Sequence, residues 1–209
     1  MSNNYREVDL NTWDRKMHHD IFRNSVEPFF CVSFEVDITK FLSMVKSNNY
    51  SFTIAFIYAL AKCANEIEEF RYRFLDEKVV IYDKIDTSFT YLNKETELFK
   101  MVDMELTDTM DEYVKKANKK ANEQEEYFVS PPGNDIFQFS PFPWISFLNI
   151  SHTNSGNKNN AVPIFDFGKY ELKGDKVIIP MSVHAHHSFV DGLHVGKFYE
   201  LLTEYLNSF

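Results

Sequence analysis

The stretch Pro180-Met-Ser-Val-His-Ala-His-His-Ser-Phe-Val-Asp-Gly-Leu-His-Val-Gly196 contains four of the chain's seven histidines. They are His184, His186, His187 and His194, with the pair Asp191-Gly192 before the last of them. A histidine beside a carboxylate has the chemistry of a general base near neutral pH. The pattern also indicates that a strand ends and a helix begins here, which is a common setting for catalytic residues. We therefore predict a catalytic site in this stretch.

The composition limits the kind of protein that the chain can be. Its 209 residues are enough for one domain, 1–209, with a buried core. Hydrophobic residues make up 44% and charged residues 25%, which is ordinary for a globular protein. The net charge of −9 argues against a nucleic-acid partner, because no basic surface is evident that would neutralise phosphates. The 21 phenylalanines predict an aromatic core or an apolar ligand pocket.

Cysteine usage and hydropathy indicate a cytoplasmic location. Cys31 and Cys63 belong to no CxxC or Cys/His metal pattern, so we expect two buried thiols in a reducing compartment. The polar first residues lack the apolar core of a signal peptide. The longest apolar run, 52–61, is too short to span a bilayer, so we expect no membrane partner.

Hydrophobic periodicity predicts interleaved helices and strands. Helices are expected at 11–24, capped by Asn11 or Thr12, from 37 onward, and at 53–70, 107–127 and 192–206. Strands are expected at 30–38, 79–82, 88–92, 144–150, 161–169 and 176–184, with an exposed loop at 151–160. Because the two kinds of element are interleaved along the chain, the expected fold class is α/β.

Three roles are open for His187 from the residues alone: a general base, a metal ligand or a histidine packed in the core. His184 and His186 share one face of the predicted strand and would supply at most two metal ligands. No further ligand cluster is evident in the sequence, so we expect no metal site.

A resemblance to a known family narrows these roles. His186-His187-Ser188-Phe189-Val190-Asp191-Gly192 matches the HHxxxDG signature of CoA-dependent acyltransferases, which also occurs in dihydrolipoyl acyltransferases and condensation domains. Over nearly its whole length the chain resembles the trimeric chloramphenicol acetyltransferases, in Trp13-Asp-Arg-Lys-Met-His18, Val36-Asp-Ile-Thr39, Lys94-Glu-Thr-Glu-Leu-Phe99, Pro143-Trp-Ile-Ser-Phe147, Gly168-Lys-Tyr170 and Gly192-Leu-His-Val-Gly196. These motifs in the correct order are far more specific than HHxxxDG alone.

The resemblance implies a fold, an assembly and a reaction. The fold would be a two-layer α/β sandwich with a mixed β-sheet covered by helices. The assembly would be a homotrimer with each site at a subunit interface. Acetyl-CoA would be the co-substrate, with no metal or prosthetic group, and a hydroxyl of chloramphenicol would be the small-molecule acceptor.

The resemblance also implies the catalytic residues. His187 would take a proton from the acceptor hydroxyl as it attacks the thioester. Asp191 would pair with Arg15 and hold the loop that carries His187. Asn149 stands where the family usually has a serine that donates to the oxyanion, and its amide retains a donor for that role.

The binding residues are carried over in the same way. Lys169 and Tyr170 lie in the segment near which family members bind CoA. Residues at or close to positions that line the chloramphenicol pocket are Ile21, Phe22, Val26, Phe30, Phe99 and Ile164. Core packing is the alternative for each of these apolar side chains. Asp166 replaces a threonine that is usual near the catalytic centre, and a carboxylate there favours a polar or cationic acceptor.

The departures from the family pattern leave two alternatives open. Asn149, Asp166 and the segment 26–30 all lie on the acceptor or oxyanion side, while the His/Asp/Arg framework is intact. One alternative is an acetyltransferase of the same fold with a different hydroxyl, amine or thiol acceptor. The other is a non-catalytic binding protein that retains the fold.

Overall fold

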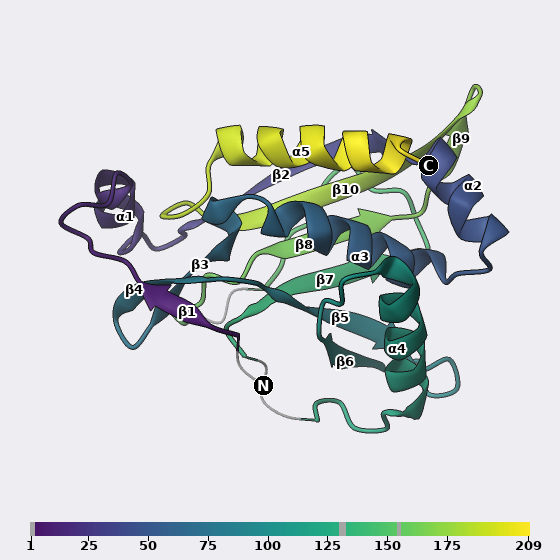
Figure 1. The fold of residues 1–209 in the computed structure, drawn as a ribbon, viewed down its shortest axis with the longest axis horizontal. Coiled ribbons are helices and arrows are strands. Elements are labelled where there is room, and N and C mark those ends of the chain that lie inside the picture. The colour runs from purple at the N-terminus through teal and green to yellow at the C-terminus, as the bar shows by residue number, and fades with distance from the viewer. Residues whose placement is uncertain (1–2, 130–132, 154–155) are drawn as a thin grey trace.

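The fold is an α/β arrangement in which helices cover one face of a large mixed β-sheet (Figure 1). The computed structural model describes residues 3–129, 133–153 and 156–209. The helices are α1 (Lys16–Phe22), α2 (Thr39–Ser47), α3 (Phe52–Asn65), α4 (Met110–Glu123) and α5 (Gly192–Asn207), with a short 3-10 turn at Glu68–Arg71. Helices α3, α4 and α5 lie side by side in front of the sheet.

The large sheet has the strand order β2-β10-β8-β7-β5-β6, and β9 pairs with β10. Its strands are β2 (Phe29–Asp37), β5 (Asp86–Leu92), β6 (Phe99–Met104), β7 (Ile136–Phe142), β8 (Ile164–Gly168), β9 (Glu171–Lys173) and β10 (Lys176–His186). Strands β5, β7 and β8 are parallel, whereas β2, β6, β9 and β10 pair in antiparallel fashion. The mixed sheet implied by the resemblance is therefore confirmed.

The register of β10 brings distant parts of the sequence together. His184 lies opposite Cys31 of β2 on one side and opposite Ile164 of β8 on the other. Ser182 lies opposite Asp166 of β8. The histidine-rich end of β10 thus has a neighbouring strand on each side.

Helix α3 forms the centre of the core. Ten of its 14 residues are buried, as expected for an apolar helix without glycine or proline. It ends at Asn65, earlier than the predicted 53–70. The Asn65 side chain donates to the Ile85 carbonyl at 2.9 Å and accepts from the Ile85 amide at 2.8 Å. An asparagine that bonds to backbone elsewhere competes with the continuation of a helix.

A second, three-stranded sheet has the order β1-β4-β3, built from β1 (Tyr5–Glu7), β3 (Tyr72–Leu75) and β4 (Lys78–Tyr82). Arg73 of β3 is fully buried. Its guanidinium donates to the carbonyls of Phe70, Tyr72, Asn134 and Ile136, the last of which belongs to β7. Because a buried charge needs several partners, this arginine fastens the small sheet to the large one.

The strand predicted at 144–150 is wrong. The strand of this region is β7, which ends at Phe142, and the segment after it is irregular, with Trp144 and Leu148 exposed. Pro141 and Pro143 limit ladder pairing here. The irregular segment packs on β8 instead, where a Cβ on Gly168 would lie only 3.0 Å from the Ile145 carbonyl oxygen. Gly168 is therefore required for this close approach.

Two predicted helices are shorter than expected. The segment 11–24 is helical only in α1, and the N-cap position is Arg15 rather than Asn11 or Thr12. Helix α4 begins after Thr109, whose hydroxyl accepts from the Glu112 amide at 3.3 Å.

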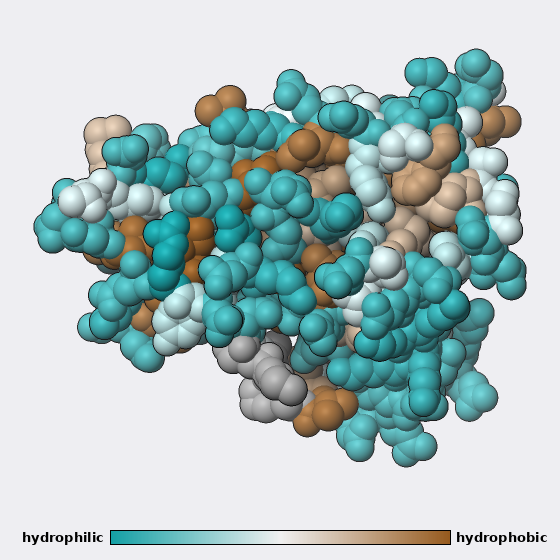
Figure 2. Space-filling view, viewed as in Figure 1, coloured by the Kyte–Doolittle hydropathy of each residue, from teal (hydrophilic) through white to brown (hydrophobic). Residues whose placement is uncertain are grey.

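Figure 2 shows that the outer surface on the helical side of the molecule is mostly hydrophilic. None of the helices in the described ranges is long and apolar enough to cross a membrane.

Candidate active site

His187 lies just beyond the end of β10 in a pocket of aromatic rings. Its imidazole stacks on Phe22 at a centroid distance of 4.1 Å and lies 4.7 Å from the ring of Phe30. Its Nδ1 is 3.1 Å from the carbonyl oxygen of Val190. Because a carbonyl only accepts, Nδ1 carries the proton and donates it to this bond. The Nε2 lone pair is then available to take a proton from a substrate.

The backbone turn that presents His187 is built from local bonds. Pairing of β10 with β2 ends at His186, opposite Phe29, and the amide of His187 then donates to the Pro28 carbonyl at 2.9 Å. Helix α5 starts three residues after this turn, with Asp191 as its N-cap. The Asp191 carboxylate accepts from the Leu193 amide at 3.0 Å, which satisfies one of the free donors of the first helical turn.

Asp191 also forms an ion pair with Arg15, as the resemblance implies. The Nη1 and Oδ2 atoms are 3.0 Å apart, and the two side chains are 14% and 26% exposed. Burial acts to raise the pKa of Asp191, but the hydrogen bond from Arg15 and the charge of His194 outweigh it and lower the pKa. The ion pair connects the segment just before α1 with the start of α5, the helix that follows His187 in the chain.

His186, the first histidine of the pair, has a different environment. Its ring packs against Phe29, Phe74 and Phe189, and its Nδ1 accepts from the Ser188 amide at 3.2 Å. Burial, followed by the charges of Arg23, His19 and His187, lowers the pKa of His186 to about 4. A neutral, buried His186 supports the turn that presents His187.

This burial predicts a pH effect on stability. At pH values between the ordinary histidine pKa of about 6.5 and the folded pKa of about 4, His186 is protonated in the unfolded chain but neutral in the folded chain. Stability therefore falls as the pH falls through this window. From about pH 7 to pH 5, His186 should account for about 2 kcal/mol of that loss. Urea unfolding of wild type and His186→Asn at both pH values measures it, since asparagine retains an acceptor for Ser188. An equal loss in the two proteins would contradict the assignment.

A second group of polar side chains lies beside the His187 pocket. Nε2 of His152 is 2.7 Å from Oδ1 of Asp166, and Nε2 of His184 is 3.2 Å from Oδ2 of the same carboxylate. Burial opposes the charged forms of Asp166 and His184. The hydrogen bonds among them prevail, so the pKa of Asp166 is lowered and that of His184 is raised to about 9.

These side chains border a cavity of about 270 Å³. Phe30 and Ile164, both predicted to bind the acceptor, line it together with His152 and His184. Asp166, fully buried, stands behind the two histidines. Because Phe30 also contacts His187, the cavity and the histidine pocket share a wall.

Phe99, also predicted to line the acceptor pocket, is not brought to His187 within one chain. Phe99 begins β6, the edge of the sheet opposite to β2, and its ring packs on Tyr127 at 5.5 Å. The side chains of Ile21, Val26 and Asn149 are exposed.

The predicted CoA-binding pair follows β8. The amide of Lys169 donates to the Ile145 carbonyl at 3.0 Å, and the ring of Tyr170 packs edge-on against Phe52 at 5.2 Å. Both side chains are exposed, so both remain accessible to a ligand.

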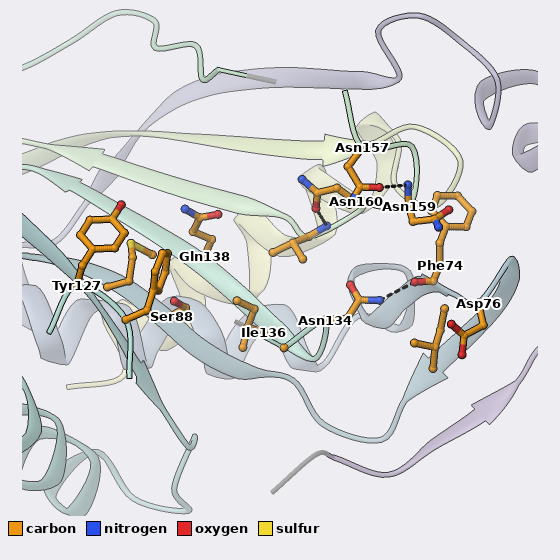
Figure 3. A pocket seen from close by; sticks show the side chains of 15 residues that line it. Phe74, Asp76, Ser88, Tyr127, Asn134, Ile136, Gln138, Asn157, Asn159 and Asn160 are labelled. Atoms are coloured by element: carbon orange, nitrogen blue, oxygen red, sulfur yellow. Dashed lines mark hydrogen bonds between the residues drawn. The ribbon is translucent and has the colours of Figure 1, made fainter. Parts of the chain in front are cut away.

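A larger cavity of about 570 Å³ lies between β3, β5, β7 and the loop before β8 (Figure 3). Several of its polar groups are used by the protein itself. Asn134 donates to the Phe74 carbonyl at 2.6 Å, and the side chain of Asn160 accepts from the Val162 amide at 3.1 Å. Tyr127, the partner of Phe99, lines its other end. No histidine borders it among the described residues, and its one acidic side chain is Asp76.

Sequence reasoning missed His152 as a member of the site. It lies 14 residues from Asp166 and comes from a loop that was predicted only to be exposed. One signal was available. A carboxylate in the middle of the apolar strand Ile164–Gly168 needs a buried partner, and a histidine is a suitable one.

The comparisons with known proteins agree with this geometry. A family model described as chloramphenicol acetyltransferase matches residues 3–203. Chloramphenicol acetyltransferase 2 of Escherichia coli is 30% identical over 203 residues, 95% of each chain. A chloramphenicol acetyltransferase of Klebsiella is 32% identical over 204 residues, 96% of this chain and 93% of the relative.

Solved structures show the same fold. A chloramphenicol acetyltransferase structure superposes with a TM-score of 0.89 at 26% identity, covering 98% of this chain and 100% of the other. The dihydrolipoamide acetyltransferase of Azotobacter vinelandii, at 13% identity and a TM-score of 0.66, covers 92% of this chain and 86% of its own and shares the fold. With the family model, these matches show that the chain belongs to the chloramphenicol acetyltransferase family.

Proposed function

We propose that this protein transfers the acetyl group of acetyl-CoA to a hydroxyl of chloramphenicol, with His187 as the general base. The observation that carries the proposal is the orientation of the His187 ring. Val190 holds Nδ1 in its protonated form, and Phe22 and Phe30 restrain the imidazole from two sides. A base that is fixed in one tautomer and shielded by apolar rings is suited to take a proton from a neutral hydroxyl.

The reaction has two proton transfers. Nε2 of His187 takes the hydroxyl proton while the oxygen attacks the thioester carbon, giving a tetrahedral oxyanion. The carbon–sulfur bond then breaks, CoA leaves as the thiol with the proton from His187, and the acetyl ester remains on the acceptor. The side-chain amide of Asn149 would donate to the oxyanion, because a developing charge needs a donor already in place.

Lys169 and Tyr170 would bind CoA. They follow the end of β8, whose first residue, Ile164, lies opposite His184. Five residues of extended strand, about 17 Å, separate Lys169 from Ile164. An elongated co-substrate such as acetyl-CoA is long enough to span this distance and place its thioester near His187.

The active assembly would be a homotrimer. Within one chain, Phe99 begins the edge strand β6 and His187 follows β10, near the other end of the strand order, although the family resemblance places both at one site. Symmetric association would bring the His187 of one subunit to the Phe99 and Tyr127 side of its neighbour. Apolar surface for such contacts is offered by Val26, which is fully exposed, and by Leu148, which is 94% exposed. The single-domain organisation and the cytoplasmic location stay predictions.

A different acceptor is the second candidate. The cavity beside Phe30 is lined by His152 and His184, with Asp166 bonded behind them, and an aryl antibiotic does not require this polar group. An acceptor with polar or charged substituents would pair with these side chains better.

Free-CoA release from acetyl-CoA, with and without chloramphenicol, tests the proposal. We expect release that depends on chloramphenicol, with the acetyl ester detected by mass spectrometry. Release with other hydroxyl or amine acceptors, but not with chloramphenicol, would transfer the assignment to the second candidate. No release with any acceptor would indicate a binding protein and contradict both.

A further inference from the structure

His152, Asp166 and His184 bring donor atoms from three separate segments together, and Cys31, which is exposed rather than buried as expected, lies beside His184 on a fourth. The donor atoms of His152, Asp166 and His184 all lie within 4.8 Å of one another. The sulfur of Cys31, on β2, is 3.3 Å from Nε2 of His184, on β10. Asp166 comes from β8 and His152 from the loop before it. None of these four side chains takes part in the proton and acetyl transfers proposed for His187.

The geometry differs from a catalytic relay. In a Cys-His-Asp relay, one ring nitrogen of the histidine faces the thiol and the other faces the carboxylate. In this group the same atom, Nε2 of His184, faces both Cys31 at 3.3 Å and Asp166 at 3.2 Å. His152 also presents its Nε2 to Asp166, at 2.7 Å. Donor atoms that converge in this way share a centre, as metal ligands do.

We propose that His152, Asp166 and His184, with Cys31 as the fourth donor, bind a divalent transition-metal ion, for which Zn²⁺ fits best. Two imidazole nitrogens, one carboxylate oxygen and one thiolate sulfur suit Zn²⁺ rather than Mg²⁺ or Ca²⁺, which prefer oxygen ligands. In a tetrahedral zinc site such atoms are about 3.3–3.6 Å apart. The distances of 2.7 Å from His152 to Asp166, 3.2 Å from Asp166 to His184 and 3.3 Å from His184 to Cys31 are near these values. Metal binding would draw the exposed Cys31 sulfur closer to His152 and Asp166.

The surroundings hold the ligands in position. Oγ of Ser182 donates to Oδ2 of Asp166 at 2.9 Å, and Asp166 and His184 are both buried on paired strands. Hydrogen bonds of this kind, made to a ligand rather than to the ion, orient metal-binding carboxylates. The carboxylate and the thiolate together carry two negative charges, which offset the charge of the ion. The ion would fasten the loop of His152 to the three strands β2, β8 and β10.

The test uses full-length protein that has been treated with a chelator and then titrated with Co²⁺. We expect one Co²⁺ per chain, with visible bands typical of tetrahedral coordination and a near-ultraviolet band from thiolate-to-metal charge transfer. Equimolar Zn²⁺ should bleach these bands and raise the Tm. A wild-type protein without tetrahedral Co²⁺ bands would overturn the proposal. This measurement needs no acceptor, so its outcome is independent of the proposed transferase activity.

Matched variants identify the ligands. His184→Gln and His152→Ala should weaken Co²⁺ binding by at least about a hundredfold. Cys31→Ser should remove the charge-transfer band, whereas Cys63→Ala, which changes a buried thiol in α3, should retain it. His152 lies on a loop with 27% of its side chain exposed, so its replacement should leave the fold intact even if a change at buried Asp166 does not. Unaltered Co²⁺ affinity in His152→Ala and His184→Gln would overturn the site.

Discussion

Replacing His187 with alanine should lower kcat/KM for CoA release by at least about a thousandfold, the upper part of the range for loss of a general base. The reason is specific to Nε2. The Val190 carbonyl fixes the proton on Nδ1, and Phe22 and Phe30 pack against the imidazole, so no other base is held in this position. The rate of free-CoA release at saturating acetyl-CoA measures the loss.

The alanine also leaves a space between two aromatic rings, so a second variant separates shape from chemistry. His187→Gln fills much of that space but cannot accept and return a proton as imidazole does. Both variants should be equally inactive, with wild-type circular dichroism and sedimentation. Turnover within tenfold of wild type in either variant would remove His187 as the base.

Asp191→Asn should cost about 3 kcal/mol of unfolding free energy and also lower kcat. The change leaves the Arg15 guanidinium, whose side chain is 14% exposed, without its counter-charge. It also removes the negative charge from the first turn of α5, where a carboxylate is favoured. For a chain of this length the Tm should fall by about 6–12 °C. Urea and thermal unfolding measure the first effect, and steady-state kinetics measure the second.

A double-mutant cycle decides whether the pair itself is responsible. Once Arg15 is glutamine, the Asp191→Asn change should cost only the negative charge at the start of α5, about 1 kcal/mol at most, because asparagine caps a helix as well as aspartate does. The coupling energy should therefore be about 2 kcal/mol, since residues in direct contact are not additive. Additive losses, or an unaltered kcat in the single variants, would show that the ion pair does not position His187.

The local parts of the fold were readable from the sequence. Helix α5 and strand β10 have strong periodic patterns, and the HHxxxDG motif lies at their junction, so the positions of His187 and Asp191 followed from neighbouring residues. The segment 136–150 was not readable in this way. Apolar residues occur on both sides of Pro141 and Pro143, and only packing against β8 through Gly168 decides which half pairs as a strand.

The long-range parts of the site required the structure. The resemblance assigns Phe99 and Phe30 to one pocket, but the strand order places β6 and β2 at opposite edges of the sheet. The group of His152, Asp166 and His184 depends on a register between β8 and β10 that no short pattern encodes. A residue's place on a strand is predictable from periodicity, whereas its neighbours across the sheet are set by pairing.

Helix α1 has a consequence for how the enzyme fails. None of its seven residues is buried, yet this segment supplies Phe22, which stacks on His187, and begins right after Arg15, which holds Asp191. A helix with so little buried surface opens at a lower free energy than the large sheet. On heating, the enzyme should therefore lose activity at a lower temperature than the one at which the whole protein unfolds. Activity and far-ultraviolet circular dichroism would then report two separate temperatures, and cooling after the first should restore turnover without refolding.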